Sequence, residues 1–436
     1  MTSRAQPKLI WRLVEESLSD AAFLWTRLDQ ALDAPDFTLS DVERWVEKRL
    51  IGSLDGVRLA GSAALSPLLA EAFVDQDPGF VSTAAYVLAT MGTTDAQKAL
   101  ENNLRQLTDE RVSAVARGLG RTGNSAALHS LWSRVQDASN ACRACVLEAL
   151  AFCGAAPHAE WTSLLTAENA GLRRTAARAL AFLPAEKRSE VMWVALQSPD
   201  LEVRKRGNIA ALIAGDSAAW PRCCEGVRAQ NVEATSAQAM LMVAMLGSRT
   251  EQAQLCQALT VPELKQHALW ALSFAGSSDA VDACVAEALA GQHVALACHA
   301  IAAITGVELS KLSAAAPGVA SASKPEDDTN ETACAIDVAA LERWWKTERQ
   351  RFDPAARYQH GKPKTLATLR EGLSSGKTWR RHAIALEVSV RSRGALRVQT
   401  FGFCSEQRRQ MKLDALDSRQ LREAVSLLGI EPIAEA

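Results

Sequence analysis

A helix-stopping residue recurs every 29 to 32 residues through the middle of the chain, and this register constrains the fold more than any other feature. Each stop follows a segment rich in Ala and Leu, such as LEALAFCG or WALSFAG. Glycine adopts the left-handed conformation at a helix C-terminus without a steric penalty, and proline cannot continue a helix. The same helix therefore ends at the same place in each unit. The stops are Gly92, Gly123, Gly154, Pro184, Gly215, Gly247, Gly276 and Gly306.

The residues before the stops also repeat. Four positions before a stop the residue is mostly Leu, and eight positions before it the residue is mostly small. Such columns are typical of a helix packed closely against its neighbours. A second helix is predicted after each stop, for example over residues 126–135 and 187–196. The unit is a helical hairpin of about thirty residues, and stacked hairpins form an all-α fold, an α-solenoid.

Two units resemble a known repeat class. DLEVRKRGNIAALIAG (residues 200–215) and NAGLRRTAARALAFLP (residues 169–184) resemble HEAT-like repeats, in which an acidic turn precedes an apolar–Arg pair at the start of the inner helix. The basic residue recurs in four units, and we expect it to bond carbonyl groups or an acidic turn residue. This repeat class hosts many functions, so it implies no activity. The basic positions are Arg143, Arg173, Arg204 and Lys265.

The two ends of the chain carry a narrower resemblance. EESLSDAAFLWTRLDQAL, LIGSLDGVRLAG, GKPKTLATLREGLSSGKTWRRHAIALEV and FGFCSEQ resemble an uncharacterised proteobacterial HEAT-repeat family. Members of that family tend to be encoded beside components of type VI secretion. These motifs are not catalytic. The resemblance therefore implies a cellular context, that of an accessory or adaptor protein, rather than a reaction.

Four regions are predicted. Residues 1–73 form an N-terminal helical cap, and residues 74–312 form the HEAT-like solenoid. Residues 313–332 are rich in Ala, Ser, Pro and acidic residues without periodicity, which is typical of a flexible linker or loop. Residues 333–436 form a helical, basic region. It begins with an amphipathic helix whose tryptophans we expect to pack partly on the solenoid, and it contains one short extended segment, ALRVQTFGF.

Basic residues are concentrated near the C-terminal end of the sequence. Between Lys362 and Lys412 there are 12 basic and three acidic residues, whereas the whole chain has 48 basic and 50 acidic ones. The balanced total does not favour a dedicated nucleic-acid-binding protein, but the basic end keeps such a solenoid as an alternative. The longest apolar run is eight residues, far below the ~18 that span a bilayer. With no secretory signal in the sequence, we expect a cytoplasmic protein without a membrane span.

The stretch EGLSSGKTWRR (residues 371–381) ends like a phosphate-binding loop. That loop requires G-x-x-x-x-G-K-[ST] between a strand and a helix, because its backbone N–H groups must surround phosphate. Here Gly372 precedes Gly376 by four positions rather than five, and the preceding segment has helical periodicity. The stretch is therefore predicted as a link between two helices. Arg380 and Arg381 are expected on a basic surface.

No residue pattern predicts catalysis, a metal or a cofactor. Cys142 and Cys145 have the spacing of a metal or redox pair, but no second pair follows. Cys284, His293, Cys298 and His299 match no known site, and the ten cysteines are expected to be reduced and mostly buried. We therefore predict no enzyme. A HEAT-like lyase or glycosylase remains an alternative, since catalytic groups can assemble from distant positions.

The predicted function is a non-enzymatic scaffold or adaptor that binds another protein in the concave groove of the solenoid. The face of the inner helices opposite the packing columns carries residue types that are enriched at binding hot spots. The alternative is that this face of the helices is only solvated and binds no partner. The predicted partner-binding residues are Tyr86, Arg117, Glu148, Arg174, Arg178, Lys205 and Trp270.

Overall fold

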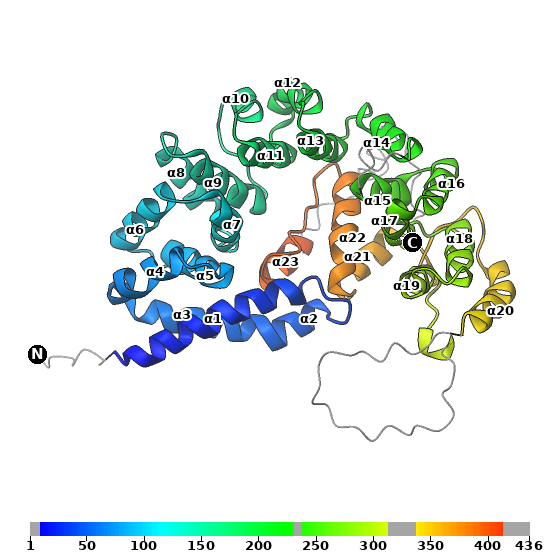
Figure 1. Cartoon of the computed structure of the whole chain (residues 1–436), viewed down its shortest axis with the longest axis horizontal. Helices are drawn as coiled ribbons and strands as arrows, with labels where there is room; N and C mark the ends of the chain where they lie inside the picture. The colour runs from blue at the N-terminus through cyan, green and yellow to red at the C-terminus, as the bar shows by residue number, and fades with distance from the viewer. Residues whose placement is uncertain (1–8, 231–236, 313–336, 413–436) are drawn as a thin grey trace, which may run out of the picture. The chain divides into compact units, whose positions relative to one another are not determined.

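The computed structural model describes residues 9–230, 237–312 and 337–412, and this part of the chain is almost entirely helical (Figure 1). It divides into two compact units. Unit 1 comprises Met1–Asp216 with Glu371–Leu421, and unit 2 comprises Ser217–Arg370 with Arg422–Ala436. The predicted C-terminal region therefore contributes to both units. The predicted linker at residues 313–332 lies entirely outside the described residues. The predicted all-α solenoid fold is confirmed.

Unit 1 stacks helical hairpins in sequence order. Its inner row is α5, α7, α9, α11 and α13, in which each helix packs on the next, and α6, α8, α10 and α12 form the outer row (Figure 1). The elements are α1 (Trp11–Ala31), α2 (Leu39–Val42), η1 (Glu43–Glu47), α3 (Lys48–Leu59), η2 (Gly61–Ala64), η3 (Leu65–Leu69), α4 (Ala70–Phe73), α5 (Pro78–Thr90), α6 (Thr94–Arg105), η4 (Asp109–Arg111), α7 (Val112–Gly120), α8 (Ser125–Arg134), α9 (Asn140–Phe152), α10 (Trp161–Leu165), α11 (Ala170–Ala179), η5 (Leu180–Phe182), α12 (Ala185–Leu196), α13 (Leu201–Ala214), α22 (Thr378–Arg391) and α23 (Cys404–Met411).

Unit 2 is also built from helical hairpins, and it contains a small β-hairpin. The β-hairpin turns at His360 and Gly361, both with positive φ, which is the conformation of a type I′ turn. Helix α21 (Leu366–Ser374) spans the boundary between the units. The other elements are α14 (Ala219–Arg228), α15 (Ala237–Leu246), α16 (Arg249–Gln257), η6 (Ala258–Thr260), α17 (Pro262–Leu272), α18 (Ser278–Leu289), α19 (Val294–Thr305), η7 (Leu309–Leu312), α20 (Val338–Glu348), η8 (Arg349–Arg351), β1 (Tyr358–Gln359) and β2 (Lys362–Pro363).

The predicted stops end the inner helices. Six of the glycines have φ between 67° and 80°, the left-handed conformation in which a Cβ would be strained. Pro184 acts differently, because it follows the extended residue Leu183 and caps α12. Gly247 is not among the glycines with positive φ. The six are Gly92, Gly123, Gly154, Gly215, Gly276 and Gly306.

Two of the four residues of the basic column, Arg173 and Arg204, bond the turns as predicted, whereas Lys265 pairs with Glu287 of α18 at 2.8 Å. Arg173 Nη1 donates to the carbonyls of Ala167 at 2.6 Å and Glu168 at 2.7 Å. Arg204 Nη1 does the same one unit later, to Ser198 at 2.6 Å and Pro199 at 3.1 Å. These bonds give each turn partners for carbonyls that its own backbone leaves free.

Helix α20 packs on α18 through one of its two tryptophans. Trp345 is 4% exposed, and its Nε1 donates to Asp282 Oδ1 at 2.7 Å. Arg349 forms an ion pair with the same carboxylate at 2.7 Å. Trp344 stays half-buried, and Arg343 and the other basic side chains of this helix lie at the surface. The expected division between a packed tryptophan and solvated charges is confirmed.

Residues 393–404 form what we call the C-terminal arm, which crosses the ends of the inner helices of unit 1 in reverse order. The segment ALRVQTFGF belongs to it and forms no strand. A helix leaves its last carbonyls without intrahelical partners, and its C-terminus carries partial negative charge. Donors of the arm supply the partners: Arg397 Nη2 bonds Ala181 O at 2.6 Å, and Gln399 Nε2 bonds Phe152 O at 3.2 Å.

The far end of the arm is anchored in the N-terminal helices. Phe401 O accepts a bond from Arg121 Nε at 3.0 Å. The ring of Phe403 lies 5.8 Å from that of Tyr86 and 6.4 Å from that of Trp25. The backbone N–H of Cys404 then donates to Glu47 Oε2 at 2.6 Å. The start of α23 is therefore held to α1 by ring packing and to η1 by a hydrogen bond.

In unit 2, residues 357–364 bind helix ends in the same way. Tyr358 N donates to Gly276 O at 2.8 Å, and His360 N donates to Ala303 O at 2.8 Å. Arg357 bonds the carbonyls that end α15, and Lys364 Nζ reaches Phe274 O at 3.1 Å. In both units, a segment from late in the sequence thus caps inner helices from earlier repeats.

The stretch EGLSSGKTWRR forms the predicted link between two helices, α21 and α22. Thr378, the first residue of α22, donates through Oγ1 to the carbonyls of Ala31 and Ala34, both at 2.8 Å. The prediction of a basic surface here is wrong, since Arg380 is 8% and Arg381 1% exposed. The reason is that α22 is packed within unit 1, where Arg381 Nε donates to Leu373 O at 2.6 Å. Burial lowers the pKa of Arg381 to about 10.

The close approach of the β-hairpin gives the stop glycines of unit 2 a second role. A Cβ on Gly306 would lie 2.6 Å from His360 O, and one on Gly276 would lie 2.8 Å from Tyr358 O. Gly291 has the same left-handed φ, but nothing lies within 4 Å of its Cβ position. The backbone conformation and the close approach can therefore be separated by substitution.

We predict that Gly306→Ala destabilises unit 2 more than Gly291→Ala does. Both should lose about 1 kcal/mol for placing Ala at positive φ, and Gly306→Ala should lose about 1–3 kcal/mol more through overpacking. Denaturant unfolding of the two variants measures the difference. Equal losses would show that the β-hairpin does not press on the end of α19.

Candidate functional site

Six of the seven predicted partner-binding residues lie on the inner helices of unit 1, and Trp270 lies on α17 of unit 2. All six in unit 1 are half-buried or exposed, as expected for a helix face opposite the packing columns. Trp270 is half-buried, with its ring 5.0 Å from that of Phe274. Their role in binding a partner stays a prediction. The six are Tyr86, Arg117, Glu148, Arg174, Arg178 and Lys205.

The central part of this face is a cluster of charges on α9, α11 and α13. Arg178 Nη1 lies 3.7 Å from Glu148 Oε1, and Arg174 Nε lies 3.1 Å from Asp200 Oδ2. Lys205 pairs with Glu202 on its own helix at 3.2 Å. The side chains of Arg174 and Arg178 are 44% and 45% exposed. Pairs that are this exposed contribute little to stability, so their arginines are accessible to other anions.

The other predicted residues of unit 1 have partners within the fold. Arg117 pairs with Asp29 of α1, and Arg121 pairs with the same carboxylate. The ring of Tyr86 packs against those of Trp25 and Phe403, each with its centre 5.8 Å away. Tyr86 thus joins the arm to the N-terminal helices, so its replacement would disturb packing as well as any partner contact.

Asp200 is the best-connected carboxylate of the cluster. It is the N-cap of α13 and accepts hydrogen bonds from the backbone N–H of Glu202 at 2.9 Å and of Val203 at 3.4 Å. Arg173 also reaches it, at 3.4 Å. Burial by itself raises the pKa of Asp200, but the hydrogen bonds from Arg174 and the backbone outweigh it, so the pKa lies below its usual value.

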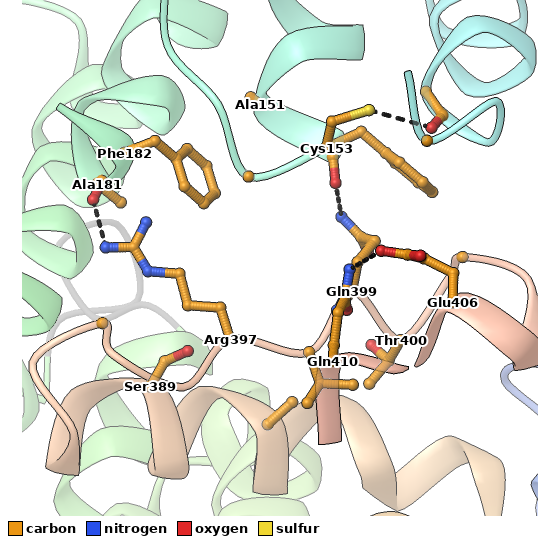
Figure 2. A pocket seen from close by; sticks show the side chains of 18 of the residues that line it. Ala151, Cys153, Ala181, Phe182, Ser389, Arg397, Gln399, Thr400, Glu406 and Gln410 are labelled. Carbon is orange, nitrogen blue, oxygen red and sulfur yellow. Dashed lines mark hydrogen bonds between the residues drawn. The ribbon is translucent and has the colours of Figure 1, made fainter. Parts of the chain in front are cut away.

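A half-open cavity of ≈ 550 Å³ lies in unit 1 beside the arm. Its walls come from the ends of α7, α9, α11 and α13, from α22 and α23, and from the arm itself. Figure 2 shows Arg397 and Gln399 rising from the arm toward the ends of the inner helices, with Phe182 above Arg397. The wall is mixed, since Phe152, Phe182 and Leu386 line it together with arginines.

The titratable residues of the cavity wall are engaged in the fold. The ring of His382 stacks on that of Phe401 at 4.2 Å, and its Nδ1 lies 2.6 Å from Thr400 Oγ1. Burial lowers the pKa of His382. Glu406 accepts bonds from Arg409 at 2.8 and 2.5 Å, and these bonds lower its pKa. Both residues have structural partners.

Three further residues of this region, Arg206, Arg397 and Gln399, were not predicted from the sequence. Arg206 lies near Arg174 and Arg178, and donates to the backbone of Arg174 at 3.2 Å. Its signal was its position one residue after Lys205 on the same helix. Arg397 and Gln399 had no such signal, because they lie in an irregular segment that repeat periodicity cannot place.

The cysteines and histidines singled out in the sequence form no reactive or metal-binding group among the described residues. Within the described residues, no group of three or more His, Cys, Asp or Glu side chains is arranged to hold a metal ion. The described cysteines are free. Burial raises the pKa of Cys142 to about 11, and that of Cys145 well above its usual value. A buried thiol with a raised pKa is a poor nucleophile and metal ligand at neutral pH.

Comparisons with known proteins assign no family to this chain. No protein-family model matches the sequence, and no curated protein matches it. The solved structure of Escherichia coli YibA is 15% identical over 63% of this chain and 98% of its own, with a TM-score of 0.31. Human deoxyhypusine hydroxylase, solved with glycerol, is 16% identical over 66% of this chain and 96% of its own, with a TM-score of 0.18. These scores carry no argument about function.

We predict that Asp200→Asn destabilises unit 1 in a pH-dependent way. A lowered pKa in the folded state means that the ionised carboxylate stabilises the fold above the unfolded pKa, and that this stability is lost as pH falls. The loss in the variant should be about 1 kcal/mol at pH 7 and should shrink as pH falls from about 4, the pKa of an unfolded Asp, through the lower pKa of the folded state. Denaturant unfolding between pH 3 and pH 7 measures it.

Asp137→Asn is the matched control, because Asp137 also pairs with an arginine but is 74% exposed. Its effect should be much smaller. A loss for Asp200→Asn that does not change with pH would contradict the proposed role of its charge.

Proposed function

We propose that this chain is a non-enzymatic scaffold that binds another protein through the charged inner face of unit 1. The observation that carries the proposal is the cluster on α9, α11 and α13, where Arg174 and Arg178 are half-exposed and Arg178 lies 3.7 Å from its nearest carboxylate oxygen. Arginine combines a planar set of donors with an apolar stem, which suits it to protein interfaces. The repeated hairpins hold these side chains on one rigid row.

We further propose that the partner is an effector or spike component of type VI secretion, for which the chain acts as an accessory or adaptor. The support is the resemblance of both ends of the sequence to a HEAT-repeat family encoded beside such components. The mixed charge of the cluster favours a protein surface of mixed charge. Glu148 and Glu202 lie among the arginines and would repel a uniformly anionic partner.

A nucleic-acid partner at the basic C-terminal region is less favoured. Lys364, Arg380, Arg381 and Arg391 are all buried, so much of the local positive charge is inside the fold. Arg391, for example, pairs with buried Glu387 at 3.0 Å. Binding to phosphate depends on the number of basic groups that reach the surface.

The enzyme alternative lacks a positive indication among the described residues, since His382 and Glu406 in the cavity wall have structural partners.

The test is partner capture with Arg178→Glu and Lys205→Glu combined. The tagged full chain is used to recover partners from its native cell, and type VI components are quantified by mass spectrometry. Reversing two charges at an interface should reduce recovery at least about tenfold. Circular dichroism checks that the helical content is unchanged.

Arg12→Glu with Lys98→Glu is the charge-matched control, because both residues are exposed and lie on helices other than the inner row. This control should capture the partner as the wild type does. Equal recovery by the inner and outer variants, or no secretion component in the wild-type sample, would contradict the proposal.

A further inference from the structure

We propose that the cavity of unit 1 binds the carboxylate of an organic acid with an apolar body, and that Arg397 is its counter-ion. This inference does not depend on the scaffold function. Arg178 belongs both to the inner-face cluster and to the cavity wall, but the counter-ion proposed here is Arg397, which is not part of the cluster. It rests on an imbalance of charge in the cavity wall, on the free donors of one arginine, and on the size and composition of the wall.

Four arginines line the cavity, and three of them have a carboxylate partner. Arg121 pairs with Asp29, Arg178 with Glu148, and Arg409 with Glu406. Arg397 has none among the described residues. A largely buried cation without a counter-ion is unfavourable. An anion that enters the cavity would therefore bind favourably, because it supplies the negative charge that the fold does not place beside Arg397.

The guanidinium of Arg397 is already positioned. Its Nη2 is fixed on Ala181 O at 2.6 Å, and its Cζ lies 4.7 Å from the centre of the Phe182 ring. Its Nη1 makes no hydrogen bond with any described residue, and Figure 2 shows this end of the side chain beneath Phe182. Burial lowers the pKa of Arg397 to about 10, so the group remains a cation at neutral pH. A fixed, planar donor favours a planar carboxylate.

The cavity has the size and walls of a small-molecule site. Its ≈ 550 Å³ falls within the range of about 300–1,000 Å³ that is typical of ligand pockets. The apolar part of the wall includes Phe152, Phe182, Ile213 and Val398. A bare inorganic anion would leave these groups against water, whereas an acid with an apolar body would cover them. The acid can be a free metabolite or the C-terminus of a peptide with an apolar last residue.

The experiment measures binding of defined probes to the full chain by saturation-transfer NMR. The small probes are 3-phenylpropionate and decanoate, each compared with its neutral carboxamide. The peptide probe is a hexapeptide ending in Leu, with a free or an amidated C-terminus. Loss of the charge-assisted bond should weaken binding about tenfold or more, so each carboxylate that fits should bind at least about tenfold better than its amide.

Three variants test the assignment. Arg397→Met should remove the preference for carboxylate, and Ala395→Trp, at an exposed position in the cavity wall, should block all probes while leaving the guanidinium intact. Arg12→Met, at an arginine 81% exposed on α1, should bind as the wild type does. If Arg397→Met does not fold, Ala395→Trp decides the location.

Binding of the small acids alone supports the site and identifies its ligand as a free organic acid. Binding of the free peptide alone supports the site and identifies its ligand as a peptide C-terminus. The proposal is overturned if none of the carboxylates binds, if the amides bind equally well, or if folded Arg397→Met or Ala395→Trp retains wild-type binding. Arg397→Met and Ala395→Trp leave Arg178 and Lys205 unchanged, so both variants should capture a protein partner as the wild type does, whatever the probes show.

Discussion

The unpaired carbonyls at the ends of the inner helices are the constraint on which the rest of this structure depends. A solenoid of short hairpins has one such helix end in every repeat, and each leaves backbone acceptors without intrahelical partners. In this protein, late segments of the same chain supply the donors. Arg397 and Gln399 do so in unit 1, and Arg357 and Lys364 do so in unit 2. Within each unit, repeats that would otherwise contact only their neighbours are thereby joined to a common segment.

This arrangement explains why several of the C-terminal basic residues do not belong to a surface. Arg397 and Lys364 reach helix ends that carry partial negative charge, and Arg380, Arg381 and Arg391 are buried with α22. It also explains the cavity, because the arm touches the helix ends at separate points and leaves space between them. The imbalance at Arg397 follows from the same geometry. Its partner in the fold is a carbonyl dipole rather than a full negative charge.

Periodicity predicted the repeated part of the fold from local chemistry. The left-handed glycines, the buried leucine column and the Arg173 and Arg204 bonds all depend on residues close in sequence, so they could be recognised there. The inner-face residues followed from the same register, although their role is a prediction. The arm could not be placed in this way. Its contacts join residues more than 200 positions apart, as between Arg397 and Ala181, and no repeat encodes them. Arg380 and Arg381 were misplaced because charge alone does not reveal burial.

Hydrogen exchange on the full chain and on a chain that ends at Ser392 tests the role of the arm most directly. If the arm holds the inner helices, its removal should speed exchange in the last turns of α7, α9 and α11 about tenfold or more, because these ends can then open locally. Exchange in α15, α17 and α19 of unit 2 should not change, since their caps lie before residue 392. Unchanged exchange at the ends of α7, α9 and α11 would contradict the account.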